Sequence, residues 1–228
     1  MRRLLTCAIL LFSTLLLANT YSTNFPKAEN PVSEGGRWLN GKLDGQSWKD
    51  VQTTEHFAMG VPETDKYDDP TAILTGVWAP DQLAEATVRV VSEDFKSCCH
   101  EVELRLRMIV VPKKITGYEI TCSVVAAHPY VQIVRWNGPL SSFTYVASNE
   151  KDYCRNGDVL EGDVVGNTIT VRLNRKVVVT GTDRTFASGN PGIGFYQSGA
   201  PIDTYGFSQF MAIDSSDAGW AHVLSAVQ

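Results

Sequence analysis

Short runs of alternating apolar and polar residues recur along this chain. Alternation with a period of two is typical of a β-strand that has one buried face. The clearest run is Thr168–Leu173, in which every second residue is aliphatic. A Gly-Asn pair precedes this run and an Asn-Arg pair follows it, and both pairs favour tight turns. The pattern therefore predicts a strand over residues 168–173 and a returning strand over residues 176–180.

Residues 100–111 form a second clear run. One face of this predicted strand carries aliphatic residues and Met, and the other carries charged residues. The two sets are Val102, Leu104, Leu106, Met108 and Val110 on one side, and Glu101, Glu103, Arg105 and Arg107 on the other. A turn leads to a predicted partner strand over residues 118–125. Placing Val110 opposite Tyr118 sets apolar against apolar residues, and a slip by one residue would reverse every side chain.

Further strands are predicted along the rest of the chain. Their ranges are residues 73–78, 86–91, 130–136, 143–146, 159–165, 193–196 and 204–213. Turns that contain Gly or Pro lie between several of them, and no long helical pattern alternates with them. Strands without intervening helices favour an antiparallel all-β sandwich over an α/β fold.

The strand over residues 130–136 is predicted to extend the polar face. If Val131 and Ile133 are buried, then Tyr130, Gln132 and Trp136 point to the same side as the charged residues of the 100–111 strand. Arg135 then points inward near the end of the strand, which argues against this assignment.

The first residues carry the pattern of a secretory signal peptide. Two arginines follow the initiator Met, and residues 4–18 are mostly apolar. This stretch is shorter than the roughly 20 residues that a membrane-spanning helix needs. We predict a signal peptide over residues 1–22, a domain over residues 23–214 and a tail over residues 215–228. An uncleaved anchor is the alternative. The mature chain is then secreted, periplasmic or at the cell surface, without a transmembrane segment.

The charge of the chain bears on its partners, and its cysteines bear on its disulfides. The formal net charge is −5 at pH 7, and no basic cluster follows the predicted signal peptide, so a nucleic-acid partner is not expected. Four cysteines remain in the predicted mature chain, which permits two disulfides in three pairings, with four buried thiols as the alternative. They are Cys98, Cys99, Cys122 and Cys154. A bond between the adjacent Cys98 and Cys99 is not expected, because in an extended chain they point to opposite faces.

Residues 183–196 read DRTFASGNPGIGFY. Together with the preceding turns at Asn167-Thr168 and Asn174, this segment resembles the later strands of concanavalin A-like lectin/glucanase domains. That superfamily includes laminin-G-like modules, family-16-type glucanases and several polysaccharide lyases. The resemblance implies a jelly-roll β-sandwich. It implies no single chemistry, because its glycines and prolines meet the needs of turns.

In glycan-active members of that superfamily, the concave sheet face usually carries the site. The resemblance therefore implies a carbohydrate-binding role for the polar face, because Arg can clamp a carboxylate, Gln can pair with hydroxyls and an aromatic ring can stack on a sugar. The predicted binding residues are Glu103, Arg105, Arg107, Tyr130, Gln132 and Trp136. The alternative is a solvated sheet face with cross-strand ion pairs.

Enzymatic activity stays open. The Glu-x-Asp-x-x-Glu pattern of the glucanase branch is absent, and Glu101 with Glu103 is its nearest approach. Arg105, Tyr130 and Gln132 are residue types that a uronate lyase uses, but the Gln-x-His motif of jelly-roll lyases is not matched. A polysaccharide lyase is therefore a stronger alternative than a glycoside hydrolase, and a protein-interaction module without a sugar site is a further one.

No cofactor or metal site is expected from a defined motif. Asp65, Asp68 and Asp69 lie in a predicted loop and supply the oxygens that calcium prefers, but their spacing matches no known calcium loop. Trp38 and Trp48 are predicted to pack at the edge of the sandwich, with sugar stacking as the alternative.

Overall fold

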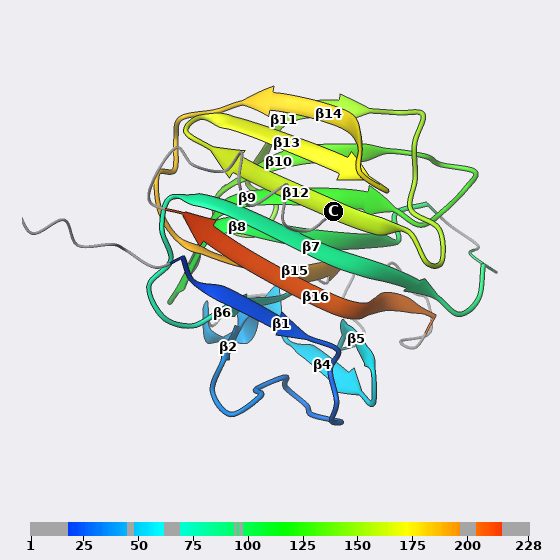
Figure 1. The fold of residues 1–228 in the computed structure, drawn as a ribbon, viewed down its shortest axis with the longest axis horizontal. Coiled ribbons are helices and arrows are strands. Elements are labelled where there is room, and N and C mark those ends of the chain that lie inside the picture. The colour runs from blue at the N-terminus through cyan, green and yellow to red at the C-terminus, as the bar shows by residue number, and fades with distance from the viewer. Residues whose placement is uncertain are drawn as a thin grey trace, which may run out of the picture.

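The computed structural model describes residues 18–44, 48–61, 69–93, 95, 98–196 and 204–215. Two sheets pack face to face, which confirms the predicted antiparallel all-β sandwich. Figure 1 shows one sheet in front, with β13, β12, β7 and β16 side by side, and the other behind it, with β10, β9 and β8.

The front sheet is called sheet A. Its strand order is β14 (Lys176–Thr182), β13 (Thr168–Leu173), β12 (Val159–Val165), β7 (Asp81–Val90), β16 (Tyr205–Ser215), β5 (Phe57–Gly60) and β4 (Val51–Thr54). A further strand, β1 (Thr20–Thr23), pairs with β16. The predicted strands over residues 168–173 and 159–165 match β13 and β12 residue for residue.

The second sheet is called sheet B. Its strand order is β11 (Phe143–Asn149), β10 (Val131–Gly138), β9 (Lys114–Ser123), β8 (Glu101–Val111), β15 (Asn190–Tyr196), β6 (Asp69–Leu74) and β2 (Trp38–Asn40). The short strand β3 (Trp48–Lys49) pairs in parallel with β6, and a 3₁₀ turn, η1 (Gly41–Asp44), precedes it. The predicted strand over residues 73–78 is wrong at its end, because β6 stops at Leu74.

The core lies between the sheets. Val102, Leu104 and Leu106 of β8 are buried in it, as are Leu160 and Val164 of β12. Val131 and Ile133 of β10 also belong to this core, so the predicted inward face of that strand is confirmed. Arg135 points inward at the strand end, as expected, and pairs with Asp183 at 2.5 Å.

The predicted register between β8 and β9 is wrong. Tyr118 lies opposite Leu106 rather than Val110, and Ile120 lies opposite Leu104. The shift is an even number of residues, so each side chain of β9 keeps its predicted face.

The predicted alternation along β8 also ends early. A bulge lies between Leu106 and Ile109, and Arg107 there adopts a positive φ of 47°. Beyond it, Met108 and Val110 join a second apolar cluster with Trp48, Trp136 and their neighbours, on the outer face of sheet B. Arg107 turns toward sheet A, where it donates to the carbonyl oxygens of Pro80 at 2.6 Å and Phe186 at 2.9 Å.

Both tryptophans of the N-terminal region are packed, as predicted. The Trp38 ring lies 5.3 Å from the ring of Phe210, and the Trp48 ring lies 4.6 Å from that of Trp136. Both side chains are buried, so neither offers a free face to a sugar.

Two disulfides are present among the described residues. Cys122–Cys154 joins β9 to the segment before β12, and Cys98–Cys99 joins adjacent residues. The expectation that Cys98 and Cys99 would not bond is wrong. It assumed an extended chain, whereas Cys99 has a positive φ of 75° and the segment lies outside any strand, so the chain turns there.

Asn19 and Tyr21, near the end of the predicted 1–22 segment, contact the sandwich. Tyr21 of β1 packs against Trp38 and Phe210, and the Asn19 amide donates to the Asp214 carboxylate at 2.6 Å. Strand β1 also pairs with β16, so residues 20–22 of the predicted signal segment are part of sheet A. Residues 1–17 of the predicted signal and residues 216–228 of the predicted tail lie outside the described residues. No helix in the described part of the chain is long and apolar enough to span a bilayer.

Candidate functional site

A pocket of about 370 Å³ opens on the outer face of sheet B. Its walls come from β6, β8, β9, β10 and β11, from the turn before β11, and from the end of β15. The thirteen lining residues are Asp69, Cys99, Glu101, Glu119, Thr121, Gln132, Val134, Trp136, Leu140, Ser141, Phe143, Tyr145 and Tyr196. Because the strands alternate, these residues occupy the positions that do not enter the core between the sheets.

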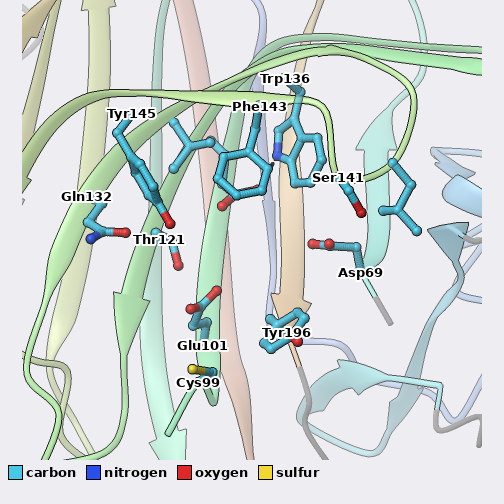
Figure 2. A pocket seen from close by; sticks show the side chains of 13 residues that line it. Asp69, Cys99, Glu101, Thr121, Gln132, Trp136, Ser141, Phe143, Tyr145 and Tyr196 are labelled. Carbon is cyan, nitrogen blue, oxygen red and sulfur yellow. Dashed lines mark hydrogen bonds between the residues drawn. The ribbon is translucent and has the colours of Figure 1, made fainter. Parts of the chain in front are cut away.

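Aromatic rings form one side of the pocket. Figure 2 shows Tyr145, Phe143 and Trp136 in a row, with Glu101 and Tyr196 on the opposite side. Neighbouring rings in the row are 5.3 Å apart in both pairs and meet edge to face. Tyr145 is 58% exposed and Phe143 is 41% exposed, so the row offers ring surface to a ligand.

A buried charge cluster lies beneath the pocket. The Arg105 guanidinium bonds to the carboxylates of Glu103 and Glu119, and it lies 3.7 Å from the Asp69 carboxylate. Its side chain has no exposed surface. The Trp136 indole N–H also donates to Glu119, so Glu119 links the charge cluster to the aromatic row.

One glycine makes room for this cluster. Gly194 of β15 lies opposite Glu103, and a Cβ atom built on it would lie 2.6 Å from Arg105 Nε. The guanidinium therefore lies against the bare backbone of β15, which no other residue type would allow without a shift. This is the physical reason for a glycine that the sequence pattern had assigned to turn geometry.

Two carboxyl groups of the cluster, those of Asp69 and Glu103, have a raised pKa and so hold protons more tightly than free carboxyls do. Burial raises the pKa of Asp69 and of Glu103 well above the usual range, and the neighbouring carboxylates add to this effect while Arg105 opposes it. Burial also raises the pKa of Glu101 to about 7, although the hydroxyl of Tyr130 donates to this carboxylate. Glu101 therefore titrates near neutral pH at this site.

The predicted binding residues separate into three groups. Gln132 and Trp136 line the pocket, and Tyr130 contacts it through Glu101. Glu103 and Arg105 lie on the expected face but are buried below the pocket floor.

Arg107 is not with the other predicted binding residues. The β8 bulge directs it toward sheet A, where it lies 3.3 Å from Asp81. The interpretation of a solvated face of cross-strand ion pairs is also incorrect for the Arg105 cluster, because its members are covered.

Eleven of the thirteen lining residues were not among the predicted binding residues, and they include Asp69, Glu101, Glu119, Phe143 and Tyr145. Glu119 alternates with Thr121 in the predicted partner strand, so a stricter use of the period-two pattern would have found it. Phe143 and Tyr145 alternate in the same way in the predicted strand over residues 143–146. Asp69 gave no such signal, because its position depends on where β6 begins.

The carboxylates of Asp69, Glu103 and Glu119 lie close enough together to suggest a metal site, since their ligand atoms all lie within 4.8 Å of one another. The Arg105 guanidinium already lies among them and supplies the positive charge. A cation in this cluster would have to displace a fully buried arginine. Of the three aspartates that could supply oxygens to calcium, Asp65 and Asp68 lie outside the described residues, and Asp69 belongs to the Arg105 cluster.

A second cavity, of about 450 Å³, lies over β1, β7 and β16 of sheet A. Its described lining has one carboxylate, Glu85, and one aromatic ring, Phe210, which is buried. Its other polar lining residues are Ser22, Thr23, Asn24, Thr87 and Gln209, so it has hydrogen-bonding groups but no accessible ring surface.

Comparison with known proteins supports the fold. No family model and no curated protein sequence matches the chain. Similar solved structures include the VIP36 exoplasmic/lumenal domain in a Ca²⁺/Man-bound form, with a TM-score of 0.60 and 14% identity over 86% of this chain and 90% of that one.

Two further matches have similar lengths. The metal-free Emp46p carbohydrate recognition domain has a TM-score of 0.55 and 16% identity, over 85% of this chain and 95% of that one. The carbohydrate binding module CBM66 from Bacillus subtilis has a TM-score of 0.53 and 13% identity, over 81% and 96%. The chain therefore has the jelly-roll fold of these lectin-like domains, and at such identities the likeness extends to the fold alone.

Proposed function

We propose that this protein binds carbohydrate in the pocket on the outer face of sheet B. The observation that carries the proposal is the pairing of an accessible aromatic row with polar groups that face it across the pocket. Aromatic rings offer an apolar surface to the C–H face of a sugar, while carboxylate, amide and hydroxyl groups hydrogen-bond to its hydroxyls. The similar structures named as carbohydrate-binding or carbohydrate-recognition domains support this class of ligand.

Export is part of the proposal. The apolar N-terminal segment supports it, and so do two disulfides, which persist in oxidising compartments. We expect a protein that is secreted, periplasmic or on the cell surface.

The test is a glycan array followed by calorimetry on the retained glycans. Tyr145→Ala removes the most exposed ring of the row and should weaken binding by about tenfold, which corresponds to the typical value of one aromatic contact. Tyr153→Ala is the matched control, because Tyr153 stacks on Arg155 and does not line the pocket. Absence of retention by any glycan, with the fold verified by circular dichroism, would leave a protein-interaction module as the better interpretation.

Glycoside hydrolysis is a second candidate, favoured by two carboxyl groups with different surroundings. Burial raises the pKa of Glu101 to about 7, which suits a general acid. Glu119 accepts hydrogen bonds from Arg105 and Trp136, and such donors stabilise a carboxylate. Both residues line the pocket.

Hydrolysis and lyase activity are separated by their products. New reducing ends that disappear in Glu101→Gln, while binding persists, would establish a hydrolase. New unsaturated uronate ends would establish a lyase. The lyase is the less favoured of the two, because Arg105 is buried and held by carboxylates, and no Lys, Arg or His is among the described residues that line the pocket.

A further inference from the structure

The residues that line the pocket set the charge that a ligand would meet. Three carboxyl groups face the space, those of Asp69, Glu101 and Glu119. None of the thirteen described lining residues is Lys, Arg or His. The nearest guanidinium, that of Arg105, has no exposed surface and is shared among carboxylates. A ligand therefore meets carboxyl groups at the pocket wall and no exposed cationic side chain among the described lining residues.

The cluster is also incompletely satisfied. Glu103 Oε1 is buried and has no hydrogen-bond partner among the described residues. The hydroxyl of Thr121 lines the pocket, yet the side chain is only 2% exposed. This hydroxyl lies near the Glu101 carboxylate and lowers the pKa of Glu101. Its geometry nevertheless gives it no hydrogen bond among the described residues. Buried polar atoms without partners are costly, and of these two only the Thr121 hydroxyl lies at the pocket, where a polar group of a ligand would satisfy it.

The aromatic row suits a cation as well as a sugar. The ring faces of Tyr145 and Phe143, the two exposed members of the row, carry negative charge density, which attracts an ammonium group within about 6 Å. Figure 2 places Glu101 and Asp69 across from this row, so an ammonium between them would meet carboxylates on one side and rings on the other. An ammonium group also supplies three N–H donors to unpaired oxygens.

We infer that the pocket selects glycans that carry free amino groups, such as oligomers of glucosamine, over their N-acetylated and uronate counterparts. The inference rests on the proposed function, because it names the class of sugar for the same pocket. A metal ion fits less well than an ammonium, because Arg105 already lies among the carboxylates that would coordinate it.

The experiment compares four probes by calorimetry on the full-length mature protein near neutral pH. They are a glucosamine trimer, the N-acetylglucosamine trimer, a galacturonate trimer and trilysine. The glucosamine trimer should bind at least about tenfold more tightly than the acetylated trimer. Trilysine should bind weakly, which would separate recognition of an amino sugar from general attraction to an acidic protein.

Matched variants locate the effect. Glu101→Gln should remove most of the preference for the amino sugar, and Tyr145→Ala, which changes an exposed side chain, should weaken the glucosamine trimer by a similar factor. Asp163→Asn removes a carboxylate from the outer face of sheet A and should leave the preference unchanged.

Two outcomes would overturn the inference. Equal or tighter binding of the acetylated trimer, still sensitive to Tyr145→Ala, would refute the amino-sugar preference and leave carbohydrate binding in place. Binding of trilysine as tight as that of the glucosamine trimer would reduce the effect to general charge attraction. If no trimer and no glycan on the array binds the folded protein, the proposed function fails as well.

Discussion

Each sheet carries one arginine among carboxylates on its outer face, and the two clusters differ in what covers them. On sheet A, Arg172 pairs with Glu161 at 2.6 Å and with Asp163, and the arginine side chain is 20% exposed. On sheet B, Arg105 pairs with Glu103 and Glu119 and has no exposed surface. The residue types are the same, so the difference comes from their neighbours.

Those neighbours are Gly194 and two tryptophans. Gly194 lets the Arg105 guanidinium lie against β15, and the Trp48 ring lies 5.7 Å from the guanidinium carbon. Trp136 bonds to Glu119 and begins the aromatic row. An ion pair in water contributes little to stability, whereas an ion pair under such cover depends on complete pairing. Trp136 therefore both covers the Arg105 cluster and lines the pocket above it.

The largest expected effect comes from deleting each arginine. Arg105→Met leaves buried carboxylates without a partner and should lower the free energy of unfolding by about 3–5 kcal/mol. Arg172→Met should cost less, because the arginine side chain is 20% exposed and water can replace part of its contact with the two carboxylates, which are each 10% exposed. Urea denaturation of both variants measures the difference.

A double variant guards against a protein that does not fold. Combining Arg105→Met with Glu103→Gln removes one of the unpaired charges and should recover part of the loss. Equal losses for Arg105→Met and Arg172→Met would show that burial does not separate the two clusters.

The face on which each cluster lies could be predicted from the sequence, but its burial could not. Period-two alternation placed Glu103 and Arg105 on one face, and it placed Gln132 and Trp136 beside them. Alternation reports which side a residue faces, but it does not report what covers that side. The cover over Arg105 comes from β3, β10 and β15, which are distant in sequence, so a polar face was expected where the structure has a buried cluster.

The β8 bulge also could not be predicted from the sequence. A bulge adds one residue to one strand, and every later side chain changes face. In the run from Glu101 to Val111, charged and apolar residues alternate as far as Arg107 and residues 108–111 are all apolar, so the alternation ends near the bulge without showing which residue is extra. Arg107 was therefore assigned to the pocket face, although it donates to the carbonyl of Pro80 toward sheet A.

An intermediate effect is expected from filling the space at Gly194. Gly194→Ala places a methyl group where the Arg105 guanidinium lies, so the cluster must shift. We expect a loss of about 1–3 kcal/mol in the free energy of unfolding, typical of overpacking, together with weaker ligand binding in the pocket above.

Combining Gly194→Ala with Arg105→Met tests whether the glycine acts through the arginine. If the methyl group acts by displacing the guanidinium, the double variant should lose much less stability than the sum of the losses of the two single variants. Full additivity would mean that Gly194 serves the backbone of β15 and not the arginine.

The smallest effect concerns pH. Burial raises the pKa of Glu101 from its ordinary 4.5 to about 7, against the opposing effects of Tyr130, Thr121 and Arg105 and with the support of Glu119. The folded protein then binds more protons than the unfolded chain between these two values, so the free energy of unfolding falls as pH rises from about 4.5 to about 7. Glu101 lines an open pocket, so solvent screening limits the fall to the order of 1–2 kcal/mol.

Glu101→Gln should remove this part of the pH dependence, measured as urea midpoints between pH 4.5 and pH 7.5. Asp163→Asn is the counterpart on sheet A, where burial also raises the pKa of Asp163. Its effect on the slope should be smaller, because the Asp163 carboxylate is bonded to a partly exposed Arg172 and has no aromatic cover. Equal slopes for the two variants would mean that the pocket adds nothing to the proton affinity of its carboxyl groups. A steeper slope for wild type than for Glu101→Gln alone would tie that proton to the site where the ligand is expected to bind.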